Sequence, residues 1–114
     1  MTARIRSIIH PVKDLAKAKA LYGELLGVEP IMDEPYYVGY KVGGLDIGLD
    51  PQGHSKGLAG SVAYWDVDDI RKTMQGLVDA GAEILQEPTD VGGGLLIALV
   101  KDTDGNVIGL SQPA

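Results

Sequence analysis

The feature that most constrains the fold is a repeat, because the chain carries one pattern twice. Residues 12–31 read VKDLAKAKALYGELLGVEPI, and residues 67–85 read VDDIRKTMQGLVDAGAEIL. Each segment has a valine, an aspartate two residues later, an apolar stripe with helical spacing and a closing glycine. Each therefore predicts a helix, capped at its start by Asp14 or Asp69. A duplication of this length indicates two similar modules.

Strand-like segments flank both predicted helices. A strand-like run precedes each helix, and a short edge strand and a hairpin follow it, YYVGYKV-GG-LDIGLD in the first half and LLIALVK-DTDG-NVIGLS in the second. The order predicts βαβββ twice, in an α+β fold. We expect a single domain over residues 1–114, with module 1 at about residues 1–57 and module 2 at about residues 58–114.

Composition excludes several classes of function. The 114 residues contain no cysteine, which rules out disulfides and thiolate ligands. The net charge of −6, without clustered Lys and Arg, argues against a nucleic-acid partner. No apolar run approaches the roughly 20 residues of a membrane-spanning helix, and the N-terminal segment does not resemble a signal peptide. We therefore expect a cytoplasmic protein that binds neither nucleic acid nor membrane.

The VxD helix entries, the LLG ending and the GGG…ALVKDTDGN hairpin together resemble the vicinal oxygen chelate superfamily. This superfamily includes glyoxalase I, extradiol dioxygenases, and fosfomycin- and bleomycin-resistance proteins. The resemblance implies two modules that form a curved mixed sheet, with a concave cup on one side and helices outside. It also implies four metal-ligand positions, which fall here on Ser7, Gly48, Val62 and Gly109. None of these residues is a strong metal donor, so we expect no metal and no cofactor.

Glycines inside two predicted strands call for an explanation, since glycine weakens a strand. With Gly43–Gly44 as a two-residue turn, Gly39 lies opposite Gly48 and Lys41 opposite Asp46. Such small residues serve either the close approach of a neighbouring element or the room needed by a bulky ligand. Both interpretations stay open.

The second hairpin predicts a similar pair of small residues. A four-residue turn at Asp102–Gly105 places Ala98 opposite Gly109. The two hairpins would then carry minimal side chains at equivalent places.

Strand alternation selects the candidate ligand-binding residues. They share a place on the face expected to be concave, or in the loop beside it: Ser7, Ile9, Tyr37, Gly39, Asp46, Gly48, His54, Val62, Tyr64, Asp66, Ala98 and Gly109. Tyr37 and Tyr64 are the candidates for stacking on a flat ligand. If the protein is an enzyme, its only available acid/base set is His54, in the connecting loop, with Asp46, Asp50 or Asp66. His10 falls on the helix-facing side and is interpreted as structural.

The periodicities also predict the core between helices and sheet. Its expected members lie on the apolar helical stripes or on the helix-facing side of the strands: Leu21, Leu25, Ile47, Leu49, Trp65, Leu77, Val78, Ile108 and Leu110.

The function expected from these features is metal-independent binding of a small organic molecule. The resemblance suggests an aromatic or cationic drug-like ligand, sequestered as in the bleomycin-resistance branch. One alternative is a lyase-, isomerase- or dioxygenase-like enzyme that uses other acid/base residues or a relocated metal. Another is a vestigial dimerisation module. We also expect a homodimer, because edge strands would otherwise be exposed.

Overall fold

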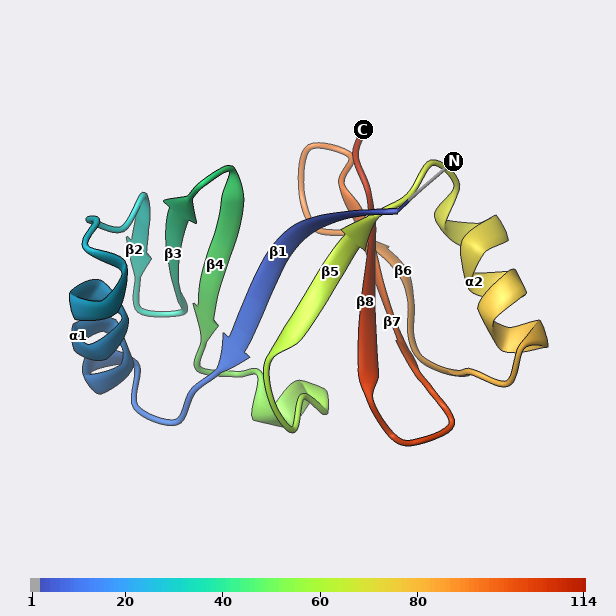
Figure 1. Ribbon diagram of the computed structural model, residues 1–114, viewed down its shortest axis with the longest axis horizontal. Coiled ribbons are helices and arrows are strands. Elements are labelled where there is room, and N and C mark those ends of the chain that lie inside the picture. Colours follow the sequence, from blue (N-terminus) through green and yellow to red (C-terminus); the bar gives the residue numbers. More distant parts are fainter. Residues whose placement is uncertain (1–2) are drawn as a thin grey trace. The chain divides into compact units, whose positions relative to one another are not determined.

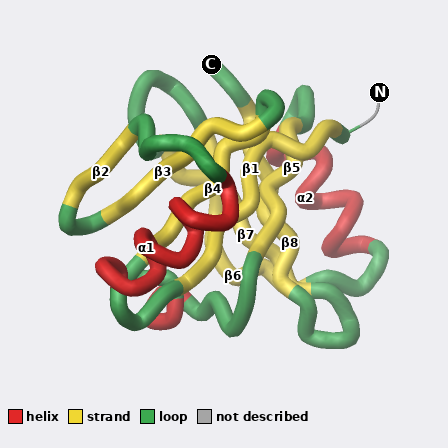
Figure 2. The backbone as a smooth tube through the Cα atoms, turned by 60° about the vertical axis from the view of Figure 1, so that its left-hand side comes forward, coloured by secondary structure: helices red, strands yellow, loops and turns green. Residues whose placement is uncertain are grey.

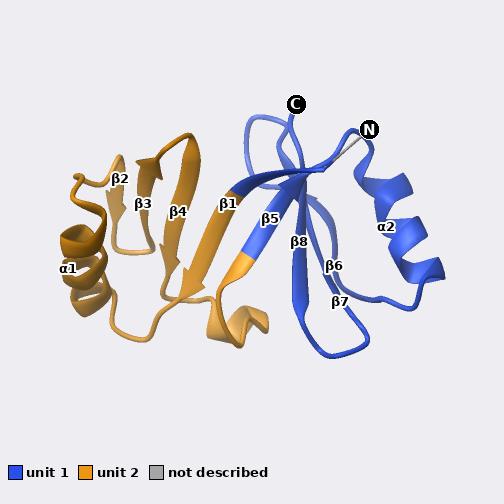
Figure 3. Ribbon diagram, viewed as in Figure 1, with its two compact units in different colours: residues 1–6, 63–114 blue, residues 7–62 orange. Residues whose placement is uncertain are grey.

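The computed structural model describes residues 3–114, which form two compact units (Figure 3). Unit 2 is Ser7–Val62, and unit 1 combines Ala63–Ala114 with the segment that ends at Arg6. The first strand therefore contributes residues to both units. Each unit is described separately below.

Unit 2 contains one helix and four strands (Figure 1). In chain order these are β1 Arg4–Pro11, α1 Leu15–Leu26, β2 Met32–Glu34, β3 Tyr37–Val42 and β4 Leu45–Asp50. The strands lie in the order β2-β3-β4-β1, with β1 parallel to β4 and the other neighbours antiparallel. A 3-10 helix, η1 at His54–Lys56, follows β4.

Unit 1 repeats this arrangement. Its elements are β5 Val62–Asp66, α2 Ile70–Asp79, β6 Glu83–Asp90, β7 Leu96–Lys101 and β8 Val107–Gln112. They lie in the order β5-β8-β7-β6, and β5 is parallel to β8. The predicted βαβββ repeat and the α+β class are confirmed.

Both helices begin where the sequence predicts. The side chain of Asp14 accepts a hydrogen bond from the Lys17 amide, and Asp69 accepts one from Lys72, so each caps the first turn. Gly27 ends α1 in the left-handed conformation, at φ 69°, where glycine has no steric penalty.

The helix α1 covers one face of β3 and β4 (Figure 2). The core on this side joins Ala18 of α1 to strand residues, with Leu15, Tyr22 and Leu26 packed against it. The predicted inward stripe was therefore wrong for Leu21 and Leu25, which are 71% and 74% exposed. The 100° rotation per residue turns these two leucines away, because Ala18 and Tyr22 set the inward direction.

In unit 1 the core joins α2 to β7 and β8. Its buried members are Val67, Ile70, Met74, Ala98, Val100 and Leu110, with Leu77 and Ile108 packed against them. Of the other predicted core residues, Ile47 and Leu49 are buried in unit 2, and Val78 is half-buried. Trp65 was wrongly predicted, because it is 37% exposed and stands outside this cluster.

The first hairpin has the predicted register. Gly39 pairs with Gly48, Lys41 with Asp46, and Val42 with Leu45.

The second hairpin differs from the prediction by one residue. Lys101 pairs with Val107, so Leu99 lies opposite Gly109 and Ala98 lies opposite Leu110. The cause is Asp102, whose carboxylate accepts hydrogen bonds from Asn106 and Asp104 and so draws Asn106 into a five-residue turn. The amide of Asn106 is the main reason that the pKa of Asp102 is lowered.

Among residues 3–114, no helix is both long and apolar enough to cross a membrane.

The corrected core predicts opposite outcomes for two leucines. Leu110→Ala should lower the free energy of unfolding by about 2–5 kcal/mol, because it empties a buried site. Leu25→Ala should change it by less than about 0.5 kcal/mol, because Leu25 is exposed. Urea unfolding of the two variants measures both, and a large loss for Leu25→Ala would contradict the assigned helix face.

Candidate ligand-binding face

The sheet of unit 2 has one face away from α1, here called the open face. Because side chains alternate along a strand, the residues neighbouring the core positions point to it. They are Ser7, Ile9 and Pro11 of β1, Tyr37, Gly39 and Lys41 of β3, and Asp46, Gly48 and Asp50 of β4.

A tyrosine ring covers the two paired glycines of this face. A Cβ atom at Gly48 would overlap the Tyr37 hydroxyl and lie 2.6 Å from Tyr37 Cζ and 2.8 Å from Ile9 Cδ1. A Cβ at Gly39 would lie 3.1 Å from Tyr37 Cε2. The glycines therefore allow the ring to rest directly on the backbone, which is a known way to compensate for glycine in a strand.

Unit 1 has the same kind of contact. A Cβ at Gly109 would lie 2.6 Å from Cδ2 and 2.7 Å from Cγ of Tyr64, and 3.0 Å from the Ala63 carbonyl oxygen. Tyr64 is only 8% exposed, whereas Tyr37 is half-buried. Tyr64 is thus a packing residue, and Tyr37 is the more accessible ring.

The aspartates of the open face are engaged by lysines. Lys41 Nζ lies 2.9 Å from Asp46 Oδ1, across the β3–β4 pair. Lys56 Nζ lies 2.7 Å from Asp50 Oδ2, and the Gln52 amide donates to the other oxygen of Asp50 at 2.8 Å. These contacts neutralise much of the negative charge of the face.

In unit 1, Asp66 is paired with an arginine and a serine. Its Oδ1 accepts from Arg6 Nε at 2.7 Å and from the Ser111 hydroxyl at 2.5 Å. Ser111 is fully buried. The sequence patterns did not reveal the contacts of these aspartates with Arg6, Lys56 and Ser111. Arg6 and Ser111 are distant from Asp66 in sequence, and Lys56 lies in the connecting segment after β4.

The two histidines have different settings. His54 is exposed on η1, a segment fixed to the end of β4 by the Lys56–Asp50 pair and by backbone bonds to Asp50. His10 stacks on Tyr22 with ring centroids 4.8 Å apart, which confirms its helix-facing position. Burial lowers the pKa of His10.

Only part of the predicted site comes together in one place. Ile9, Tyr37, Gly39 and Gly48 form one contiguous cluster on the open face, next to Asp46. Ala98 does not belong with the candidate face, because the one-residue shift places it in the core against α2. Ser7 and Val62 are buried, and each of them is an end residue of unit 2.

A family model described as the Glyoxalase/Bleomycin resistance protein/Dioxygenase superfamily matches residues 4–110. The chain belongs to this superfamily. No curated protein matches the sequence.

Solved structures agree with this membership. A glyoxalase/bleomycin resistance protein/dioxygenase superfamily member from Vibrio splendidus 12B01 is 20% identical with a TM-score of 0.73, over 97% of this chain and 99% of that chain. Hypothetical protein BH1468 from Bacillus halodurans C-125 is 15% identical with a TM-score of 0.76, over 100% and 96%. Methylmalonyl-CoA epimerase from Mycobacterium tuberculosis is 17% identical with a TM-score of 0.65, over 97% and 88%. At these identities the likeness establishes the fold alone.

The residues at the superfamily's metal positions do not fit a metal ion. Gly48 and Gly109 offer no donor atom, and a longer side chain at either place would collide with a tyrosine ring. Val62 is apolar, and one serine hydroxyl at Ser7 is too weak a ligand on its own. Within the described part of the chain, no three His, Cys, Asp or Glu side chains are grouped to hold a metal ion.

The two ring–glycine contacts predict unequal costs for added methyl groups. Gly109→Ala should destabilise the protein by about 1–3 kcal/mol, because the added Cβ meets the root of the buried Tyr64 ring and a backbone oxygen. Gly48→Ala should cost less, because the hydroxyl end of Tyr37 can turn aside. Gly60→Ala is the control, since nothing lies within 4 Å of its Cβ position.

A double-mutant cycle identifies the source of the cost. In a Tyr64→Ala background the penalty of Gly109→Ala should shrink, with a coupling energy of about 0.5–3 kcal/mol. Thermal or urea unfolding supplies the four free energies, and additive values would show that the ring is not what excludes the side chain.

Proposed function

We propose that the chain binds a small, flat aromatic molecule on the open face of unit 2, without a metal ion. The observation that supports this most is the Tyr37 ring, which rests on Gly39 and Gly48 and stays half-buried. A ring that already rests on backbone has less conformational freedom to lose when a second ring stacks on it. Ile9 extends the apolar surface beside it.

The charges of this face favour a neutral ligand over a cation. Asp46 and Asp50 already hold Lys41 and Lys56, so neither carboxylate is left to pair with a ligand cation without breaking an existing contact. A neutral aromatic compound avoids this cost.

A binding role fits these contacts better than catalysis. General acid/base chemistry needs a group within hydrogen-bond reach of the substrate and able to exchange a proton. Asp46, Asp50 and Asp66 are held in ion pairs, and His54 is exposed on the connecting segment. The proposal is therefore a sequestering or sensing protein rather than an enzyme.

The test is an NMR titration with indole as the reference probe. Tyr37→Leu should weaken binding by about 3–10-fold, the value of an aromatic pair, and Tyr37→Phe should bind like the unchanged protein. Tyr36→Leu is the matched control, because Tyr36 is the adjacent tyrosine and is 62% exposed.

Two results would overturn the proposal. One is an indole affinity that does not respond to Tyr37→Leu. The other is binding that appears only after addition of Zn²⁺ or Mn²⁺ and disappears with a chelator.

A further inference from the structure

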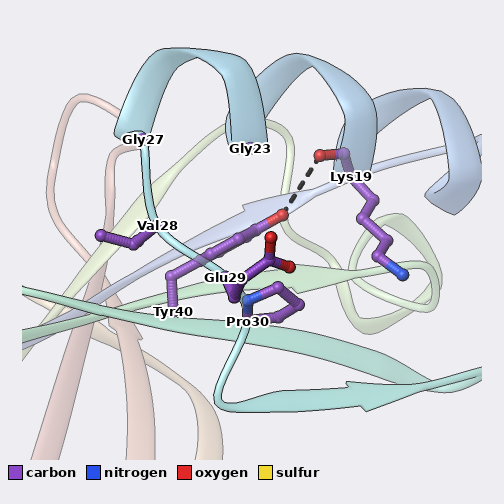
Figure 4. Close-up of a pocket in the computed structure, with 7 residues that line it drawn as sticks. All are labelled: Lys19, Gly23, Gly27, Val28, Glu29, Pro30 and Tyr40. Atoms are coloured by element: carbon purple, nitrogen blue, oxygen red, sulfur yellow. Dashed lines mark hydrogen bonds between the residues drawn. The ribbon is translucent and has the colours of Figure 1, made fainter.

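A cavity lies beneath the end of α1 (Figure 4), on the side of the unit 2 sheet that α1 covers. It has a volume of about 250 Å³, and its lining residues are Lys19, Gly23, Gly27, Val28, Glu29, Pro30 and Tyr40. Pockets for drug-sized ligands span roughly 300–1,000 Å³, so this cavity suits a smaller molecule.

One wall of the cavity is a glycine inside a helix. Gly23 lies three residues before the end of α1, where glycine is among the least favourable residues. A Cβ at this position would stand 3.9 Å from the Tyr40 hydroxyl and would occupy the space above it. No packing need explains the glycine, because a methyl group there would meet its neighbour at ordinary contact distance.

The polar groups around the cavity are mostly hydrogen-bond acceptors. Glu29 extends into the space beside Tyr40 (Figure 4), and it has no ion-pair partner among residues 3–114. The cavity also lies at the negative end of the helix dipole of α1, where the Gly27 amide caps the Gly23 carbonyl at 3.0 Å. The Tyr40 hydroxyl donates to the Lys19 carbonyl at 3.2 Å, so its lone pairs remain available.

The one cation at the cavity is already neutralised. The Lys19 ammonium forms an ion pair with Asp33. The hydrogen bond from Lys19 to Asp33 is the main reason that the pKa of Lys19 is raised, and the charge of Glu29 adds a smaller contribution. The remaining charge is that of Glu29, so the cavity is electronegative.

We propose that this cavity is a binding site for a small organic cation of the alkylammonium class. The ammonium group donates to the Glu29 carboxylate, and its short carbon chain lies against Val28 and Pro30. A carboxylate or phosphate is disfavoured, because it would meet acceptors only. The site is distinct from the aromatic face and does not depend on the function proposed for it.

The probe is n-butylammonium, followed by NMR at constant ionic strength. We expect saturable shifts in the residues that line the cavity. Butyrate and 1-butanol, which also have four carbons, should bind about 2–5-fold more weakly, since each lacks the charged donor and Glu29 is exposed to solvent. Glu29→Gln should weaken butylammonium binding by a similar factor.

Gly23→Ala separates the site from general stability. The alanine should raise the melting temperature, because it favours the helix, and it should weaken binding, because its methyl group narrows the space above the Tyr40 hydroxyl. Gly76→Ala in α2 is the matched control. Nothing lies within 4 Å of its Cβ position, so it should raise the melting temperature and leave binding unchanged.

The outcomes are decisive in both directions. A butylammonium affinity that Gly23→Ala leaves unchanged, equal binding of butyrate, or no saturable shift at all would overturn the proposal. Tyr37→Leu should leave butylammonium binding intact, and Gly23→Ala should leave indole binding intact. Failure at one site is thereby distinguishable from failure at the other.

Discussion

The contact between a tyrosine ring and a strand glycine organises both units. A glycine in a strand exposes backbone and packs poorly, yet here each ring restores the missing contact and requires the glycine in return. Tyr37 does this for Gly48 and Tyr64 for Gly109. The same pair of positions would hold metal ligands in a metal-dependent member of the superfamily. In this chain a tyrosine ring therefore occupies the space that a metal-binding side chain would take in such a member.

Charge follows the same principle of internal pairing. The protein has a net charge of −6, but Asp46, Asp50 and Asp66 each lie against a lysine or an arginine. The net charge of the whole protein therefore does not give the local charge of the open face. An argument from net charge to a cationic ligand fails at this face, because local pairing rather than the sum of charges sets what a ligand meets.

Much of the fold could be predicted from local patterns. The repeat, the Asp14 and Asp69 caps and the Gly39–Gly48 register depend on neighbouring residues and fixed turn geometry, and they were correct. The errors came from choices that local patterns leave undetermined. Leu21 and Leu25 fit an apolar stripe as well as the true inward residues do, and only packing against the sheet decides between them.

The predicted register of the second hairpin was wrong, and the predicted place of Ala98 was wrong with it. One side chain, Asp102, extended the turn by a residue and moved Ala98 to the other face of the sheet. Gly48 and Gly109 are unusual because they lie inside strands, but the sequence does not say whether a ligand or a tyrosine ring fills the space above them. Gly23 was the available signal for the cavity beneath α1, since a glycine within a helical pattern often has a packing or functional reason.

The Tyr37 ring on Gly48 also limits which side chains positions 37 and 48 can carry together. A glutamate at position 48 cannot coexist with the present place of the Tyr37 ring, since even one added carbon overlaps its hydroxyl. A glutamate there would require the ring to turn aside, which would remove its cover from the backbone of Gly39 and Gly48. The side chains at positions 37 and 48 therefore depend on each other, and an acidic residue at position 48 should disfavour tyrosine at position 37 in its present place.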